Sequence, residues 1–193
     1  MFLNPSIVKK LMKQAYKSGL VVAMNEERWL YLKGNVWEIS VLEDCLPKQT
    51  KGDLIALIGE LPLPGERIVA TPEGNQYETE LPLEMSEADF DHKKYIDITR
   101  TLLIGDGETI CRVLQDGERK YTVNNVFVDI VSPQYVMMDM GEYAPEKPMY
   151  SPWAGILWKG NGCKLRAHFR SDNSTGKILE NLKQIDLVAD NEA

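Results

Sequence analysis

The strongest constraint on the fold is a series of turn dipeptides in the middle of the chain. They separate four β-prone runs, 99–104, 109–114, 119–123 and 126–131, at Asp106-Gly107, Asp116-Gly117 and Asn124-Asn125. Gly, Asn and Asp readily adopt the positive φ angles that two-residue hairpin loops require. The pattern therefore predicts a four-stranded antiparallel meander. In that register Lys120 lies opposite Asp129, and opposite charges facing each other across a ladder stabilise the pairing.

A helix is predicted over residues 5–18. Asn4 is a good N-cap residue, Pro5 fits the first helical position, and Gly19 stands where a helix commonly ends. Apolar residues recur with helical spacing and leave four lysines on the remaining surface: Lys9, Lys10, Lys13 and Lys17. A basic amphipathic helix can lie on a membrane surface. A packed helix with a solvated lysine face is more common, so the sequence favours packing over peripheral membrane contact.

Hairpins and short helices account for most of the remaining chain. The predicted strand pairs are 28–32 with 36–41, 66–71 with 76–81, and 153–158 with 163–170. The predicted helices are 50–61, with Thr50 and Asp53 as a capping box, a short one starting at Ser86, and 175–187. These elements predict an α+β fold of antiparallel hairpins and a meander with an N-terminal and a C-terminal helix. We expect one compact domain over residues 1–193, and a division into two subdomains near residue 97 stays open.

Charge and cysteine content limit the classes of protein to which this chain can belong. The chain of 193 residues has a net charge of −7, which excludes a protein that is basic throughout. Residues 20–146 carry 24 acidic and 11 basic groups, whereas residues 147–183 carry seven basic and two acidic groups. No apolar run approaches the ~18 residues of a membrane span. No secretory leader is recognised, and three isolated cysteines are typical of reduced thiols, so we expect a cytoplasmic protein.

Catalytic signatures are largely missing from the sequence. It contains no phosphate-binding glycine loop, no zinc-protease motif and only two histidines, so we predict no catalytic residue, metal ligand or cofactor. Glu118 and Lys120 match half of a metal-dependent nuclease motif. The upstream acid Asp106 would lie ~17–20 Å away, at the other end of a six-residue strand. A metal-dependent hydrolase with unrecognised carboxylates remains an alternative, but the sequence favours a non-enzymatic protein.

The last predicted hairpin carries the best candidate binding surface. Cys163, Leu165 and Ala167 would face the core, because successive side chains of a strand alternate between its two faces. The opposite face would present a cationic and aromatic row: Trp153, Leu157, Lys164, Arg166, His168 and Arg170. Such a row could bind phosphates and stack on bases, or bind a carboxylate-bearing protein. Alternatively, acids elsewhere in the chain could neutralise the row, or the terminal helix could cover part of it.

A second candidate surface is acidic. Six carboxylates fall within fourteen residues: Glu78, Glu80, Glu84, Glu87, Asp89 and Asp91. A solvated, self-repelling loop is the simplest interpretation of this segment. Our leading hypothesis is a small interaction protein that binds a protein or nucleic-acid partner through charge-segregated surfaces. The alternatives are a nucleic-acid-binding module using the 153–170 hairpin, and an inhibitor of a nucleic-acid-binding protein that acts through the acidic 20–146 surface.

Overall fold

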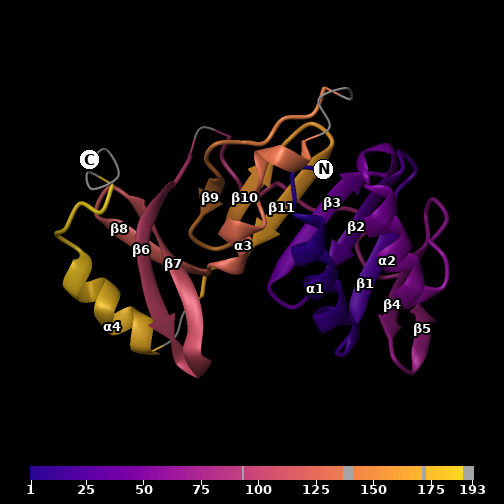
Figure 1. Ribbon diagram of the computed structural model, residues 1–193, viewed down its shortest axis with the longest axis horizontal. Helices are drawn as coiled ribbons and strands as arrows, with labels where there is room; N and C mark the ends of the chain where they lie inside the picture. The colour runs from indigo at the N-terminus through magenta and orange to yellow at the C-terminus, as the bar shows by residue number, and fades with distance from the viewer. Residues whose placement is uncertain (93, 137–140, 171–172, 189–193) are drawn as a thin grey trace. The chain divides into compact units, whose positions relative to one another are not determined.

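The computed structural model describes residues 1–92, 94–136, 141–170 and 173–188 and shows the predicted α+β fold (Figure 1). The strands form two antiparallel sheets, one of eight strands in the order β5-β4-β1-β2-β3-β11-β10-β9 and one of three in the order β6-β7-β8. The helices are α1 (Pro5–Tyr16), α2 (Lys48–Ile58), α3 (Val126–Asp129) and α4 (Asn173–Leu182). The strands are β1 (Leu20–Met24), β2 (Trp29–Lys33), β3 (Trp37–Leu42), β4 (Arg67–Thr71), β5 (Gly74–Tyr77), β6 (Asp97–Gly105), β7 (Thr109–Asp116), β8 (Arg119–Asn124), β9 (Met149–Ser151), β10 (Gly155–Lys159) and β11 (Cys163–Ala167).

The chain divides into two compact units. Unit 1 consists of residues 1–87, 130–144 and 159–166. Unit 2 consists of residues 88–129, 145–158 and 167–193. Each unit is therefore assembled from three separate stretches of sequence. Among the described residues, no helix is long and apolar enough to cross a membrane.

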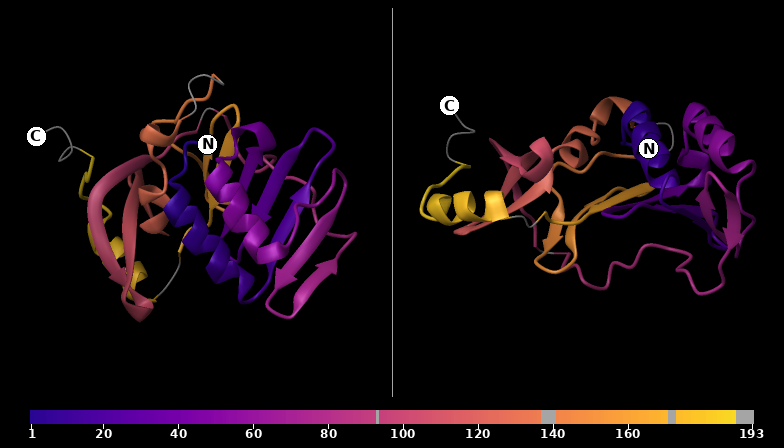
Figure 2. Two further views of the ribbon diagram at one scale, coloured as in Figure 1. Left: turned by 45° about the vertical axis from the view of Figure 1, so that its right-hand side comes forward. Right: turned by 90° about the horizontal axis from the view of Figure 1, so that it is seen from below.

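In unit 1, α1 and α2 pack on one face of the sheet that contains β1–β5 (Figure 2). The predicted cap of the first helix is confirmed, because Asn4 Oδ1 accepts a hydrogen bond of 3.0 Å from the Ser6 N–H. The buried side of α1 consists of Val8, Leu11, Met12 and Ala15. β1 lies between β2 and β4, and four of its five residues are buried, so it forms the centre of this core.

In unit 2, α4 and the segment after it lie along the sheet of β6, β7 and β8 (Figure 1). Gln115, in β7, is buried and fixes the segment that follows α4. Its Nε2 donates to Asp186 Oδ1 at 2.8 Å, and its Oε1 accepts from the Leu187 N–H at 2.9 Å. The Tyr150 hydroxyl donates to Asp116 at the end of β7, and burial together with that carboxylate raises the pKa of Tyr150 to about 12.

The fourth strand of the meander was predicted wrongly, because residues 126–129 form α3 instead. Asn124 and Asn125 cap a helix and do not turn a hairpin. Asn124 Oδ1 accepts from the Val126 N–H at 3.1 Å, and Asn125 O accepts from the N–H groups of Val128 and Asp129. The predicted pairing of Lys120 with Asp129 is consequently absent. Lys120 lies opposite Gln115 in the β7–β8 ladder.

The C-terminal helix predicted over 175–187 is shorter and begins earlier, as α4 spans Asn173–Leu182. Two other helix predictions also need correction. The helix predicted over 50–61 begins earlier, at Lys48, with Pro47 at the N-cap, so Thr50 is a buried helical residue and not a cap. No helix follows Ser86 over the described residues 87–92 and 94–96, where the chain is irregular. The buried side chains of Met85 and Phe90 hold that segment in place. Tertiary burial, and not the local capping pattern, decides the conformation at both places.

Candidate partner-binding surfaces

The burial pattern of β11 confirms the predicted alternation. Cys163, Leu165 and Ala167 are fully buried, whereas Lys164 and Arg166, on the other face, are partly exposed. Leu157 was expected on the same face as these cations, but it is fully buried in β10. Burial raises the pKa of the Cys163 thiol, and Cys45 and Cys111 are buried free thiols as well. Burial also raises the pKa of the Cys45 thiol, so neither Cys45 nor Cys163 has the depressed pKa of a nucleophilic cysteine.

Arg166 is held by internal acceptors. One of its terminal nitrogens, Nη2, pairs with Glu38 Oε1 from β3, and the other, Nη1, donates to Ser86 O at 3.3 Å. Glu38 is only 1% exposed, and Lys33 Nζ lies 3.8 Å from the same carboxylate. Tyr31 also contacts this group, and burial together with the negative charge of Glu38 raises the pKa of its hydroxyl. The guanidinium of Arg166 therefore balances a buried carboxylate.

Lys164 is likewise paired within unit 1. Its Nζ lies 2.6 Å from Glu87 Oε1, and the other oxygen of Glu87 accepts from Lys159 Nζ at 2.5 Å. The Lys164 ammonium also lies 4.7 Å from the centroid of the Trp29 ring, within the range of a cation–π contact. Glu87, predicted as part of an acidic surface, thus neutralises two lysines. Among the described residues of β11, both cations have acidic partners.

The ion pairs of Glu87 predict a specific loss of stability in acid. Partial burial raises the pKa of Glu87, but the hydrogen bonds from Lys159 and Lys164 outweigh it, so the folded-state pKa lies below its usual value. The stabilisation is present above the unfolded-state pKa and disappears as the pH falls through the lower folded-state pKa. Thermal melts from pH 7 to pH 3 should show a smaller loss of melting temperature below pH 5 for Glu87→Gln than for the wild type. Parallel pH curves for the two proteins would contradict this assignment.

Unit 2 contains the other residues of the predicted row. Trp153 was predicted to begin a strand, but it lies in the turn that precedes β10 and is 92% exposed. His168 and Arg170 follow the end of β11, so the observed strand is shorter than the predicted one, which extended to residue 170. Arg170 is tied to the small sheet, because its N–H donates to Thr122 O at 2.7 Å and its Nη2 to Asp106 O at 2.6 Å. Trp153 is thus the most accessible member of the row.

The predicted acidic segment is shared between the two units. Glu78, Glu80, Glu84 and Glu87 belong to unit 1, whereas Asp89 and Asp91 belong to unit 2. All except Glu87 are exposed, and Glu84 accepts a hydrogen bond of 3.2 Å from Asn25 Nδ2. In the part of the chain that the structure describes, no group of three or more His, Cys, Asp or Glu side chains is arranged to hold a metal ion.

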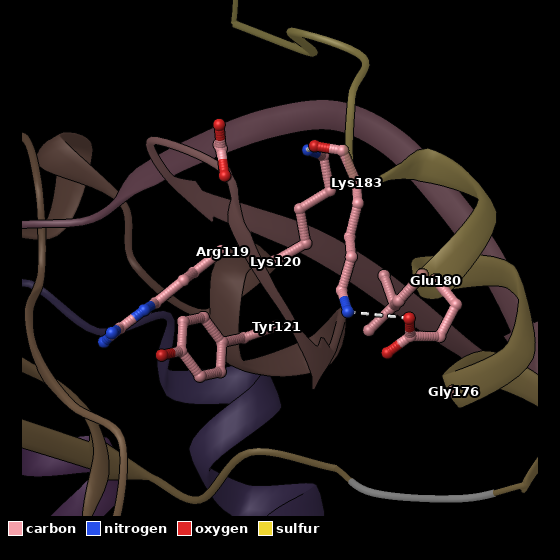
Figure 3. Close-up of a pocket in the computed structure, with 8 residues that line it drawn as sticks. Arg119, Lys120, Tyr121, Gly176, Glu180 and Lys183 are labelled. Carbon is pink, nitrogen blue, oxygen red and sulfur yellow. Dashed lines mark hydrogen bonds and ion pairs between the residues drawn. The ribbon is translucent and has the colours of Figure 1, made fainter.

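A cavity of about 450 Å³ between α4 and the β7–β8 turn was not anticipated from the sequence (Figure 3). It is lined by Glu118, Arg119, Lys120, Tyr121, Gly176, Leu179, Glu180 and Lys183. The lysines have acceptors within unit 2: Lys120 Nζ donates to Lys183 O at 3.1 Å, and Lys183 Nζ lies 2.7 Å from Glu180. Arg119 extends to the other side of β8 from the two lysines. The cations that line the cavity therefore do not point toward one common position. An anion-binding site would require such convergence.

Comparisons with known proteins identify no family. No family model matches the chain, and no curated protein matches it. One solved structure with weak similarity is that of a putative DNA polymerase III beta subunit from Eubacterium rectale. The sequences are 9% identical and the TM-score is 0.35, over 94% of this chain and 67% of that chain. A similarity this distant supports no inference about function.

Proposed function

We propose that this chain is a small non-enzymatic interaction protein, and that Trp153 anchors its macromolecular partner. The supporting observation is the exposure of the indole, which at 92% is the highest among the exposed large apolar side chains of the described residues. Aromatic side chains bury ~150–250 Å² each, and covering apolar area contributes roughly 25 cal/mol per Å². A partner that covers Trp153 would therefore gain several kcal/mol, before association costs, from one residue.

The position of Trp153 suits an anchor because its support is rigid. The turn leads directly into β10, where Ile156, Leu157 and Trp158 are essentially fully buried. Gly155 adopts a φ of +91° and packs closely against the backbone of Ala167 and His168. A side chain on a fixed turn loses little conformational entropy on binding. Trp is also among the residues that most often dominate the binding energy of protein interfaces.

The charge distribution favours a protein partner over a nucleic acid. Most of the affinity for nucleic acids comes from Lys and Arg side chains that neutralise phosphates. Lys164 and Arg166 already neutralise Glu87 and Glu38, and the chain carries a net charge of −7. An exposed indole could stack on a single-stranded base, but few cations of the predicted row are available to bind the phosphate backbone of a nucleic acid.

The anchoring role is tested by comparing two exposed aromatic residues. Tagged wild-type, Trp153→Ala and Tyr77→Ala proteins are used to recover partners from the native cell, with and without nuclease treatment. Tyr77 is the control because it is 68% exposed and lies in unit 1. We expect to recover a partner protein whose binding is unaffected by nuclease treatment. Its recovery should fall at least tenfold with Trp153→Ala but not with Tyr77→Ala. Equal recovery of every bound protein by all three would contradict the proposal.

The nucleic-acid alternative has its own measurement. We expect no salt-dependent binding of a 20-nucleotide single-stranded DNA in fluorescence anisotropy between 25 and 200 mM salt, because the cations of β11 are paired. Lys164→Gln serves as the matched variant, since Lys164 is partly exposed and its removal leaves Glu87 paired with Lys159. Binding that weakens with salt, and further with Lys164→Gln, would favour a nucleic-acid-binding module over a protein-binding one.

A further inference from the structure

Unit 1 contains a cavity of about 260 Å³ that combines apolar walls with an ion cluster. The walls come from Met24, Ile55, Leu61 and the segment 62–64, and the charged lining residues are Arg28, Glu43 and Lys51. Leu63 is 66% exposed at the rim, whereas Met24 is buried at the end of β1. Lys51 and Ile55 stand four residues apart on α2, so they project from the same side of the helix.

Hydrogen bonds fix the walls of this cavity before any ligand arrives. The Gly65 N–H donates to Met24 O at 2.7 Å, and the Met24 N–H donates to Glu66 O at 3.1 Å. The Leu63 N–H donates to Glu66 Oε2 at 2.8 Å. The loop that carries the apolar wall is thus tied to the end of the central strand. A preformed wall lowers the ordering cost of binding.

The ion cluster carries an excess of one positive charge. Glu43 Oε2 pairs with Arg28 Nη2, and Glu43 Oε1 lies 2.7 Å from Lys51 Nζ. The hydrogen bond from Lys51, which outweighs partial burial, and that from Arg28 hold the pKa of Glu43 below its usual value, so this carboxylate stays ionised. The side chain of Arg28 is 61% exposed and that of Lys51 39%. Two partly exposed cations therefore share one carboxylate.

The backbone of Arg28 adopts an energetically unfavourable conformation. Its φ is +63°, a left-handed conformation that costs a residue with a Cβ roughly 1–2 kcal/mol. Asn25 holds the turn, because its Oδ1 accepts from the N–H groups of Glu27 and Trp29. Gly or Asn at position 28 would adopt the same φ with less strain. Strain of this kind is often retained where the side chain itself is needed.

We propose that this cavity binds a peptide segment of a protein partner in which a bulky apolar side chain lies next to a carboxylate. The cavity is smaller than the ~300–1,000 Å³ typical of small-molecule sites, which suits one side chain better than a cofactor. Its apolar walls contact that side chain, and the excess positive charge binds the carboxylate. The guanidinium of Arg can donate two parallel hydrogen bonds to a carboxylate. This site lies in unit 1 and is independent of Trp153, so each proposal can fail without the other.

A fragment titration tests the chemistry without knowledge of the peptide sequence. The ¹⁵N-labelled full chain is titrated with N-acetyl-leucine, which carries both groups, and with N-acetyl-leucinamide and acetate, which carry one each. We expect N-acetyl-leucine to shift the amide resonances of Arg28, Lys51 and Leu63, with a Kd on the order of millimolar. The other two fragments should bind at least fivefold more weakly. Absence of these shifts at 50 mM, or equal affinity for N-acetyl-leucinamide, would overturn the proposal.

Two variants connect the binding to the ion cluster. Arg28→Asn should weaken N-acetyl-leucine binding at least fivefold without lowering the melting temperature, because Asn relieves the strained φ while removing the charge. Lys48→Gln, an exposed residue of α2 that does not line the cavity, should leave the affinity unchanged. Unchanged binding by Arg28→Asn, or an equal loss with Lys48→Gln, would show that the cluster does not select the carboxylate.

Discussion

Gly155→Ala is expected to destabilise the protein by roughly 2–5 kcal/mol, combining the cost of a positive φ with that of overpacking. A Cβ at this position would lie 2.8 Å from His168 Cα and closer still to Ala167 O. Both are backbone atoms of the neighbouring strand end, so they cannot rotate away. The φ of +91° adds strain for any residue with a Cβ. Chemical denaturation, followed by circular dichroism, should show the transition midpoint moving sharply to lower denaturant concentration.

Two other glycines separate the steric cost at Gly155 from the conformational one. Gly117 has a φ of +56° but nothing within 4 Å of its Cβ position, so Gly117→Ala measures the conformational cost alone, about 1–2 kcal/mol. Gly176 lies in α4 with open space around it, and Gly176→Ala should stabilise by about 0.5–1 kcal/mol. A loss for Gly155→Ala no larger than that for Gly117→Ala would contradict the close approach described for β10.

Arg166→Met is the second substitution with a large expected effect, about 3–5 kcal/mol, because it leaves Glu38 as an uncompensated buried carboxylate. Glu38 is 1% exposed, and its remaining cation, Lys33, lies 3.8 Å away on a partly exposed side chain. Adding Glu38→Gln to Arg166→Met should recover a large part of the loss, since it removes the unpaired charge. The double-mutant cycle, measured by chemical denaturation, gives the coupling between the two residues.

The control for Arg166 is an exposed arginine. Arg119→Met removes the same charge from an exposed position at the start of β8, where substitutions usually change stability by less than about 0.5 kcal/mol. A similar loss for Arg119→Met and Arg166→Met would mean that net charge, and not the buried pair, decides the effect. Additive losses for Glu38→Gln and Arg166→Met would also contradict the assignment.

Local sequence signals predicted the elements whose stabilising contacts are themselves local. Asn4 and Pro5 start the first helix as expected, and the alternation of Cys163 to Ala167 gave the correct buried face of β11. The same kind of reasoning failed at Asn124-Asn125, because these residues suit a hairpin turn and a helix cap equally well. Side-chain hydrogen bonds to Val126 and Asp129 decide in favour of the helix.

The candidate sites could be predicted only in part, because their character depends on distant residues. Arg166 and Glu38 are 128 positions apart, and Glu87 reaches Lys164 from an irregular segment. No local pattern shows that these charges meet, so the cationic row on β11 was expected to be more available than it is. The cavity at Arg28 had no sequence signal, since the positive φ of an arginine becomes visible only in the structure.

The most direct test of the central claim is photo-crosslinking from the position of Trp153 inside the native cell. A benzophenone amino acid replaces Trp153 in one protein and Tyr77 in another, and the crosslinked products are identified by mass spectrometry. The account predicts a discrete protein adduct from position 153 that is absent from position 77. The contradicting result is no adduct from position 153, or the same set of adducts from both positions.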